Sequence, residues 1–291
     1  MAVDLHIHTA ASGDGEFSSK EIICMAAAKE LQAVAITDHD STDNVEEALY
    51  WGSKYGIEVI PGCEFSSGYQ GKWLHVLGYF IDVRHPAIQQ WCSTIQEDRR
   101  ANVDMQIDKL REAGLYVEKE KVLEGGSQPM PVSYSIAVLD DRRNDDNSLV
   151  KQYKEQKNGA IKFCLDWLAT GRPYNAPVSL PEVPEVIELI LKSGGVPVLA
   201  HPAATLGVDH DEMIGNFLKL GLAGVEAFTT WHTQEQAEHY LAYCRKRGIL
   251  ATCGSDFHGK NKPQIQLGQV SHNTYEVVQE LKALKKRQAV K

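Results

Sequence analysis

Two pairs of potential metal ligands stand near opposite ends of the sequence, each with one residue between its members. His6 and His8 close the first apolar run of the chain, and Asp256 and His258 follow the last one. In a β-strand, side chains two residues apart point to the same face. Each pair can therefore present two ligands to a single site.

More imidazole and carboxylate groups end or follow other apolar runs. They are Asp14, Asp38, His39, Asp40, Glu64, His75 and His201. A lone histidine at a strand end is usually a hydrogen-bonded structural residue, but burying this many ionisable groups together is costly unless cations compensate them. Mixtures of His, Asp and Glu without thiolates suit Zn²⁺, Mn²⁺ or Fe²⁺ rather than Ca²⁺ or a structural zinc. The set predicts a polynuclear metal centre.

The elements that must position these groups alternate between strands and helices in residues 1–82 and 186–291. The apolar runs predict strands at 3–8, 33–37, 57–64, 74–80, 196–200, 225–228 and 249–253. Helical spacing predicts helices at 19–30, 44–55, 182–193, 211–220 and 233–247. Parallel strands with crossover helices place all their carboxyl ends on one face. We therefore expect an α/β barrel with the ligands at one mouth.

The segment 83–185 does not continue the alternation of strands and helices. Helices are predicted at 98–113, 133–139 and 151–169, with Gly- and Pro-rich breaks between them. We expect a small helical insertion that covers the active-site face of the barrel.

Composition limits the classes of protein that remain. The chain has 291 residues, 43% hydrophobic and 24% charged, which is typical of a globular protein. A formal charge of −9 argues against a surface that binds nucleic acid broadly, and we expect no stable complex with a nucleic-acid polymer. Six scattered cysteines, the lack of a signal-like start and the lack of a membrane-length apolar run predict a cytoplasmic protein with reduced thiols and no membrane partner.

The motifs HxHT, TDHD, a strand-end Glu, AHP and GSDFH, in this order, resemble the PHP (polymerase and histidinol phosphatase) domain, above all its stand-alone phosphoesterases with a helical insertion. The resemblance implies a distorted (β/α)₇ TIM-like barrel with two or three divalent ions. It implies one ion on His6, His8, Glu64 and Asp256, a second on Glu64, His75 and His201, and a third on Asp14, His39 and His258. Asp38 and Asp40 would orient these ligands.

The expected function is hydrolysis of a small anionic phosphate ester, either a nucleotide bisphosphate or a sugar phosphate or cyclic phosphate. Three divalent ions outweigh the three ligand carboxylates, and metal coordination lowers the pKa of water from 15.7 to about 7, which supplies a bridging hydroxide for attack. Asp256 would hold the reacting centre, and His201 or His258 would protonate the leaving oxygen. Alternatives are a histidinol-phosphate phosphatase, an oligonucleotide exonuclease and a non-catalytic scaffold.

Candidates for substrate binding are less specific. They are Arg172, Tyr134 and Ser135 in the insertion, and Lys260, Lys262 and His232 beside the barrel ligands. His232 could instead cap the helix 233–247. Phe228 and Trp231 are expected to be packing residues.

Overall fold

The computed structural model describes residues 2–124, 128–169, 172–176, 179–206 and 208–288, and the chain divides into two compact units. The barrel unit contains Met1–Ala11, Gly15–Cys92 and Leu180–Lys291. The helical unit contains Ser12–Asp14 and Ser93–Ser179. The boundaries predicted for the helical insertion, at residues 83 and 185, stay predictions.

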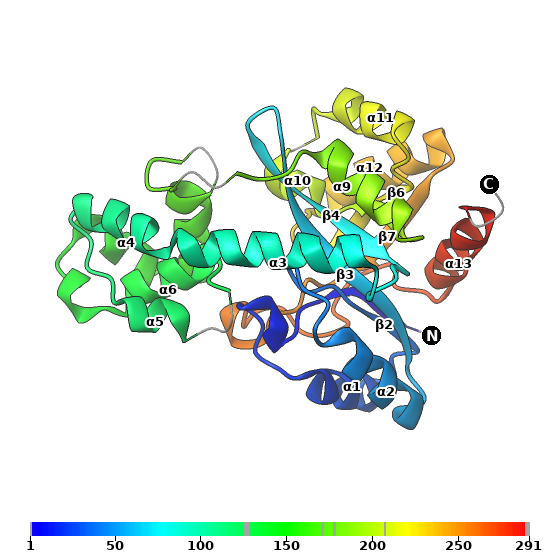
Figure 1. Cartoon of the computed structure of the whole chain (residues 1–291), viewed down its shortest axis with the longest axis horizontal. Coiled ribbons are helices and arrows are strands. Elements are labelled where there is room, and N and C mark those ends of the chain that lie inside the picture. Colours follow the sequence, from blue (N-terminus) through cyan, green and yellow to red (C-terminus); the bar gives the residue numbers. More distant parts are fainter. Residues whose placement is uncertain (1, 125–127, 170–171, 177–178, 207, 289–291) are drawn as a thin grey trace. The chain divides into compact units, whose positions relative to one another are not determined.

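The barrel unit is built on a seven-stranded sheet whose strands follow the order of the sequence (Figure 1). The strands are β1 (Val3–Ile7), β2 (Ala33–Ile36), β3 (Glu58–Tyr69), β4 (Lys72–Tyr79), β5 (Val196–Leu199), β6 (Gly224–Thr229) and β7 (Leu250–Gly254). Backbone N–H groups of Asp256 and His8 donate to the carbonyls of His6 and Phe257, at 2.9 and 3.0 Å, and bring β7 and β1 together. The predicted α/β barrel is confirmed as a nearly closed sheet.

The hairpin between β3 and β4 differs from the predicted parallel arrangement. We expected a strand that ends at Glu64, but β3 continues to Tyr69 and β4 returns antiparallel to it. The two turn residues, Gln70 and Gly71, have φ of 50° and 75°, the combination that joins twisted strands in a two-residue hairpin. His75 therefore reaches the mouth of the barrel from the first half of β4, rather than from a strand end.

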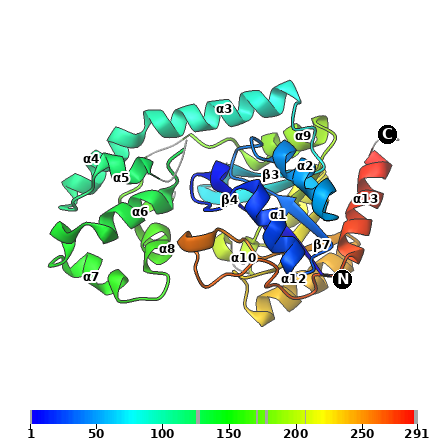
Figure 2. The same ribbon diagram turned by 90° about the horizontal axis from the view of Figure 1, so that it is seen from below.

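Helices cover the sheet of the barrel unit. They are α1 (Ser19–Ala28), α2 (Val45–Tyr55), α9 (Val183–Lys192), α10 (Pro202–Thr205), α11 (Asp211–Lys219), α12 (Gln234–Arg247) and α13 (Glu276–Gln288). α1 and α2 lie side by side (Figure 2). The side chains of Ser18 and Thr233 cap α1 and α12, each in a reciprocal capping box with the residue three positions later. His232 is thus not the cap of α12.

The helical unit has a hydrophobic core of its own, which includes Ile107, Leu110, Val138 and Phe163. Its helices are α4 (Val103–Glu112), α5 (Lys119–Leu123), α6 (Pro131–Asp140), α7 (Ser148–Lys154) and α8 (Gly159–Phe163), followed by a π-turn at Cys164–Leu168; α3 (Pro86–Ala101) enters it from the barrel unit. The predicted helices 98–113 and 151–169 are both interrupted, the second at Asn158, whose φ is 64°. None of the described helices is long and apolar enough to cross a membrane.

Candidate metal centre

Six histidines and two carboxylates, located in the strands or in the segments that directly follow them, form one buried cluster in the barrel unit. Its members are His6, His8, His39, Glu64, His75, His201, Asp256 and His258. The structure therefore brings together all the ligands predicted in this unit, including the pairs from the two ends of the chain.

Four contacts between two histidines and two carboxylates have the spacing that tetrahedral ligands need. Nε2 of His6 lies 3.2 Å from Oε2 of Glu64 and 3.4 Å from Oδ1 of Asp256, and the corresponding distances from Nε2 of His8 are 3.2 and 3.1 Å. A tetrahedral ion with bonds of about 2.0 to 2.1 Å needs ligand atoms about 3.3 Å apart. Among the described residues, Nε2 of His6, Oε2 of Glu64 and Oδ1 of Asp256 are buried without a hydrogen bond. Such atoms are costly unless a cation binds them.

The second oxygen of Glu64 belongs to another group. Oε1 lies 2.8 Å from both Nδ1 of His75 and Nε2 of His201, and these two nitrogens are 3.4 Å apart. One carboxylate can thus serve two neighbouring ions.

A third group consists of His8, His39 and His258, whose nearest ring nitrogens lie within 4.8 Å of one another. Nδ1 of His258 donates to the carbonyl of Asp256 at 2.9 Å, which leaves Nε2 of the neutral ring as the ligand atom. Asp14 is buried and belongs to the helical unit. Its role as a further ligand stays a prediction.

Glu226, on β6, is a supporting residue that the sequence analysis did not select. It is fully buried, its Oε1 lies 3.0 Å from Nδ1 of His6, and its Oε2 accepts from the backbone N–H of His201 at 2.9 Å. The carboxylate holds a proton on Nδ1 of His6, so Nε2 keeps the lone pair needed for a metal. The signal in the sequence was a single acid inside the apolar strand Val-Glu-Ala-Phe.

Other buried aspartates hold the backbone around the ligands. Asp38 accepts from the backbone N–H and hydroxyl of Thr9, at 2.6 and 2.7 Å, next to His8. Asp40 accepts from a backbone N–H of β3, two residues past the bridging glutamate, at 2.9 Å. Asp4, which the sequence analysis also passed over, accepts from the backbone N–H and hydroxyl of the residue before Asp256. These contacts suit an orienting role.

Three residues in or beside the cluster have strained backbone conformations. Asp40, His201 and Asp256 have φ of 45°, 24° and 58°, values that L-residues rarely adopt. Such conformations persist only where the surrounding structure imposes them, and they are frequent at functional sites.

The electrostatics of the cluster favour bound cations or protons. Burial opposes protonation of His6 and His8, but Glu64 and Asp256, and for His6 also Glu226, outweigh it. The pKa of His6 lies well above its usual value, and that of His8 rises to about 9. Burial also opposes ionisation of Glu64, yet the surrounding histidines hold its pKa well below its usual value. A cation can replace these protons, because it satisfies the same carboxylates.

The substrate candidates of the barrel unit have different environments. Nζ of Lys262 lies 2.5 Å from Oδ2 of Asp256, whereas Lys260 is exposed. Nδ1 of His232 donates to the carbonyl of Ala227 at 2.9 Å, and its Nε2 accepts from the backbone N–H of Ala203 at 3.1 Å. His232 thus links β6, through Ala227, to the segment that follows His201.

In the helical unit, Tyr134 packs in the core, where burial raises the pKa of its hydroxyl. Ser135 is buried and its hydroxyl donates to the carbonyl of Pro131 at 3.4 Å, while Arg172 is exposed. The roles of these residues in substrate binding stay predictions.

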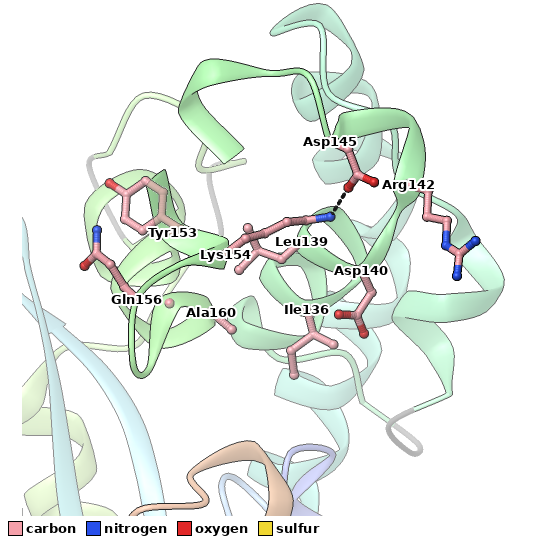
Figure 3. Close-up of a pocket in the computed structure, with 10 residues that line it drawn as sticks. Ile136, Leu139, Asp140, Arg142, Asp145, Tyr153, Lys154, Gln156 and Ala160 are labelled. Carbon is pink, nitrogen blue, oxygen red and sulfur yellow. Dashed lines mark hydrogen bonds and ion pairs between the residues drawn. The ribbon is translucent and has the colours of Figure 1, made fainter. Parts of the chain in front are cut away.

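This unit also contains an open pocket of about 490 Å³ (Figure 3). Its lining includes Ile136, Leu139 and Tyr153, and Lys154 and Asp145 form an ion pair in it. Its described lining residues include no histidine or cysteine. The described lining therefore lacks the imidazole and thiolate ligands typical of a transition-metal site.

Comparison with known proteins identifies the family. The model of the PHP domain matches residues 4–156, and the chain belongs to the PHP domain family. A phosphoribosyl 1,2-cyclic phosphate 1,2-diphosphodiesterase of Eggerthella lenta is 28% identical over 95% of this chain and 99% of its own length. A 5'-3' exoribonuclease of Haemophilus influenzae is 28% identical over 88% and 89%. A 3',5'-nucleoside bisphosphate phosphatase of Chromobacterium violaceum is 26% identical over 91% and 90%.

A solved structure supports the fold. An amidohydrolase of Chromobacterium violaceum with bound sulfate has a TM-score of 0.82, with 23% identity, 97% coverage of this chain and 96% of its own. The barrel is therefore the fold expected from the family resemblance.

Proposed function

We propose that the protein is a metal-dependent phosphoesterase that hydrolyses a small phosphate ester. The observation that carries the proposal is Glu64, which directs one oxygen to each of two ligand groups. Paired ions held a few ångströms apart are typical of enzymes that displace a group from phosphorus. The three relatives, which are named for cleaving cyclic phosphates, RNA and nucleoside bisphosphates, support the same chemistry.

The proposed ligands follow the groups described above. One ion would be held by His6, His8, Glu64 and Asp256, a second by Glu64, His75 and His201, and a third by His39 and His258. The family resemblance adds Asp14 to the third group as a prediction. Nitrogen and carboxylate ligands without thiolates favour Mn²⁺, Zn²⁺ or Fe²⁺. Divalent ions bound there would act as Lewis acids on the phosphoryl group and lower the pKa of water to about 7.

The charges of the site explain how a chain with a formal charge of −9 would bind an anion. The carboxylates of Glu64, Asp256 and Glu226 contribute three negative charges, and the ammonium group of Lys262 contributes one positive charge. Two divalent cations would therefore leave a surplus of two positive charges over these four groups, and a third would increase it, while the buried carboxyl groups of Asp38 and Asp40 reduce the surplus. Such a surplus attracts a phosphate ester even where the rest of the surface repels it.

The catalytic roles follow from position. Asp256 and His258 would hold the reacting centre in place. His201 is our candidate for protonating the leaving oxygen in a state in which it does not hold the second ion, because its 8% exposure makes it the most accessible member of the cluster. Six residues are proposed to shape substrate binding: Lys260, Lys262, His232, Arg172, Tyr134 and Ser135.

The leading substrate class is a small phosphate ester, and RNA ends are an alternative. Nucleotide bisphosphates and sugar phosphates or cyclic phosphates are supported by two of the relatives, and removal of nucleotides from RNA ends is supported by the exoribonuclease. A histidinol-phosphate phosphatase is a further alternative. The products separate them: inorganic phosphate from a bisphosphate, a ring-opened monoester from a cyclic phosphate, and mononucleotides from RNA.

The test measures metal content and product release on the same purified sample. The panel contains mono-, bis- and cyclic phosphates and a 5'-phosphorylated oligoribonucleotide. We expect bound transition metal and release from at least one substrate, and we expect Asp256→Asn to abolish release while the thermal unfolding transition persists. Metal-replete wild-type protein that cleaves nothing in the panel would favour a non-catalytic metal-bound scaffold.

A further inference from the structure

The two oxygens of Asp256 have different surroundings. Oδ1 faces the ring nitrogens of His6 and His8, at 3.4 and 3.1 Å. Oδ2 accepts instead from the indole N–H of Trp231 and from Nζ of Lys262. The ammonium group of Lys262 also lies 4.9 Å from the centre of the Trp231 ring, so the three side chains form a closed group.

We infer that Trp231 and Lys262 determine how Asp256 serves the metal centre: the indole orients the carboxylate, and the ammonium group offsets its charge. The inference rests on the proposed function only in requiring that the cluster binds cations. It gives Trp231 a positioning role in place of the packing role expected from the sequence.

The orienting effect comes from Trp231. An indole N–H can only donate, so it holds one carboxylate oxygen without competing for the cation. With Oδ2 engaged by two donors, Asp256 presents Oδ1 alone to the ligand group. Outer contacts of this kind commonly change metal affinity by about 10- to 100-fold.

The charge effect comes from Lys262. Its side chain is only 12% exposed, so water screens its interaction with Asp256 weakly. The ammonium group reduces the negative charge that a cation meets, and it adds to the positive charge that an anion meets. Lys262 should therefore weaken cation binding and strengthen phosphate binding, whereas Trp231 should strengthen cation binding.

These opposite signs define the experiment. Chelator-stripped wild type, Trp231→Phe and Lys262→Met are titrated with Mn²⁺, and the Mn²⁺-saturated proteins are then titrated with inorganic phosphate. The Phe ring keeps the packing without the N–H, and Met keeps most of the length of the lysine stem. Trp51→Phe and Lys282→Met are matched controls, because Trp51 donates to Glu47 and Lys282 to Glu58, neither of which is in the cluster.

We expect Trp231→Phe to weaken Mn²⁺ binding about 10- to 100-fold. We expect Lys262→Met to tighten Mn²⁺ binding and to weaken phosphate binding, each by roughly tenfold for one charge near the ion. Both controls should match wild type.

Unchanged Mn²⁺ affinity in Trp231→Phe would overturn the orienting role. Weaker Mn²⁺ binding or unaltered phosphate binding in Lys262→Met would overturn the charge role. If Trp231→Phe does not fold, the direction of the change in Lys262→Met still decides the charge role. A protein that binds Mn²⁺ as expected but cleaves no phosphate ester would refute the proposed function and leave this inference standing.

Discussion

Replacing Glu226 by glutamine should weaken metal binding although the side chain keeps its size. In the native protein both carboxylate oxygens accept, one from Nδ1 of His6 and the other from the backbone N–H of His201. Glutamine has one acceptor and one donor, so it cannot satisfy both contacts as they stand. The backbone N–H can only donate, and it will keep the glutamine oxygen.

The NH₂ group of the introduced amide must then face His6, which can adapt by exchanging its tautomer. With Nδ1 as the acceptor, the proton moves to Nε2, the atom that faces Glu64 and Asp256. A protonated Nε2 cannot bind a metal ion. The opposite amide orientation leaves two buried donors in contact, which costs about 1 to 3 kcal/mol. A loss of about 10- to 100-fold in metal affinity, or about 1.4 to 2.7 kcal/mol, is the expected result.

The assay is calorimetric titration of chelator-stripped protein with Mn²⁺, together with product release by the loaded enzyme. Glu58→Gln is the matched control, because Glu58 bonds to Tyr275 and Lys282 away from the cluster. Equal Mn²⁺ affinity in Glu226→Gln and Glu58→Gln, with both variants folded, would refute the tautomer argument.

Three further predictions concern stability and pH. Gly254→Ala should lower the free energy of unfolding by at least about 1 to 3 kcal/mol, because a Cβ there would lie 2.2 Å from Cβ of His6. Denaturant unfolding measures this change. The control Gly215→Ala should not be destabilising, because its Cβ meets nothing closer than 3.6 Å. Metal removal should lower the free energy of unfolding by about 2.7 kcal/mol for each ion lost, relative to protein with free metal at 100 times its dissociation constant. A thermal transition that does not respond to chelator would contradict this. The raised pKa of His8, about 9, means that metal must displace a proton at neutral pH, so affinity should fall as pH is lowered from 9 to 6, by up to about tenfold per unit for one proton. Calorimetry in buffers of different ionisation enthalpy should detect the released protons, and affinity independent of pH would contradict the assignment.

The ligand pairs could be predicted from the sequence because their geometry is local. The spacing of His6 and His8, and of Asp256 and His258, becomes a shared direction as soon as the backbone is extended. The strand pattern then required only the general rule that connected parallel strands collect their carboxyl ends on one face. No contact between distant residues had to be known in advance.

The residues that the sequence did not reveal act through distant partners. Glu226 pairs with His6 across 220 positions, and Trp231 pairs with Asp256 across 25. An acid in an apolar strand and a tryptophan after one have ordinary explanations until their partners are known. The continuation of β3 past Glu64 was missed for a related reason, since Ser66, Ser67 and Gly68 are weak strand residues by composition and are held there by pairing with β4.

Four of the ligands, His6, His8, Asp256 and His258, lie at or next to the seam that closes the barrel. β1 and β7 meet through the backbone contacts of His6 with Asp256 and of His8 with Phe257, and Asp4 binds Ser255 across the same seam. A cation held by His6, His8 and Asp256 would bridge the first and last strands of the sheet, which are separated by almost the whole chain. Metal binding and barrel closure should therefore be thermodynamically coupled, and closure of so long a loop is where such a bridge has the largest entropic effect on the unfolded chain. Amide hydrogen exchange at His8 and Asp256 should consequently slow on metal binding more than exchange in β5, whose neighbours β4 and β6 are held by sheet pairing outside this seam.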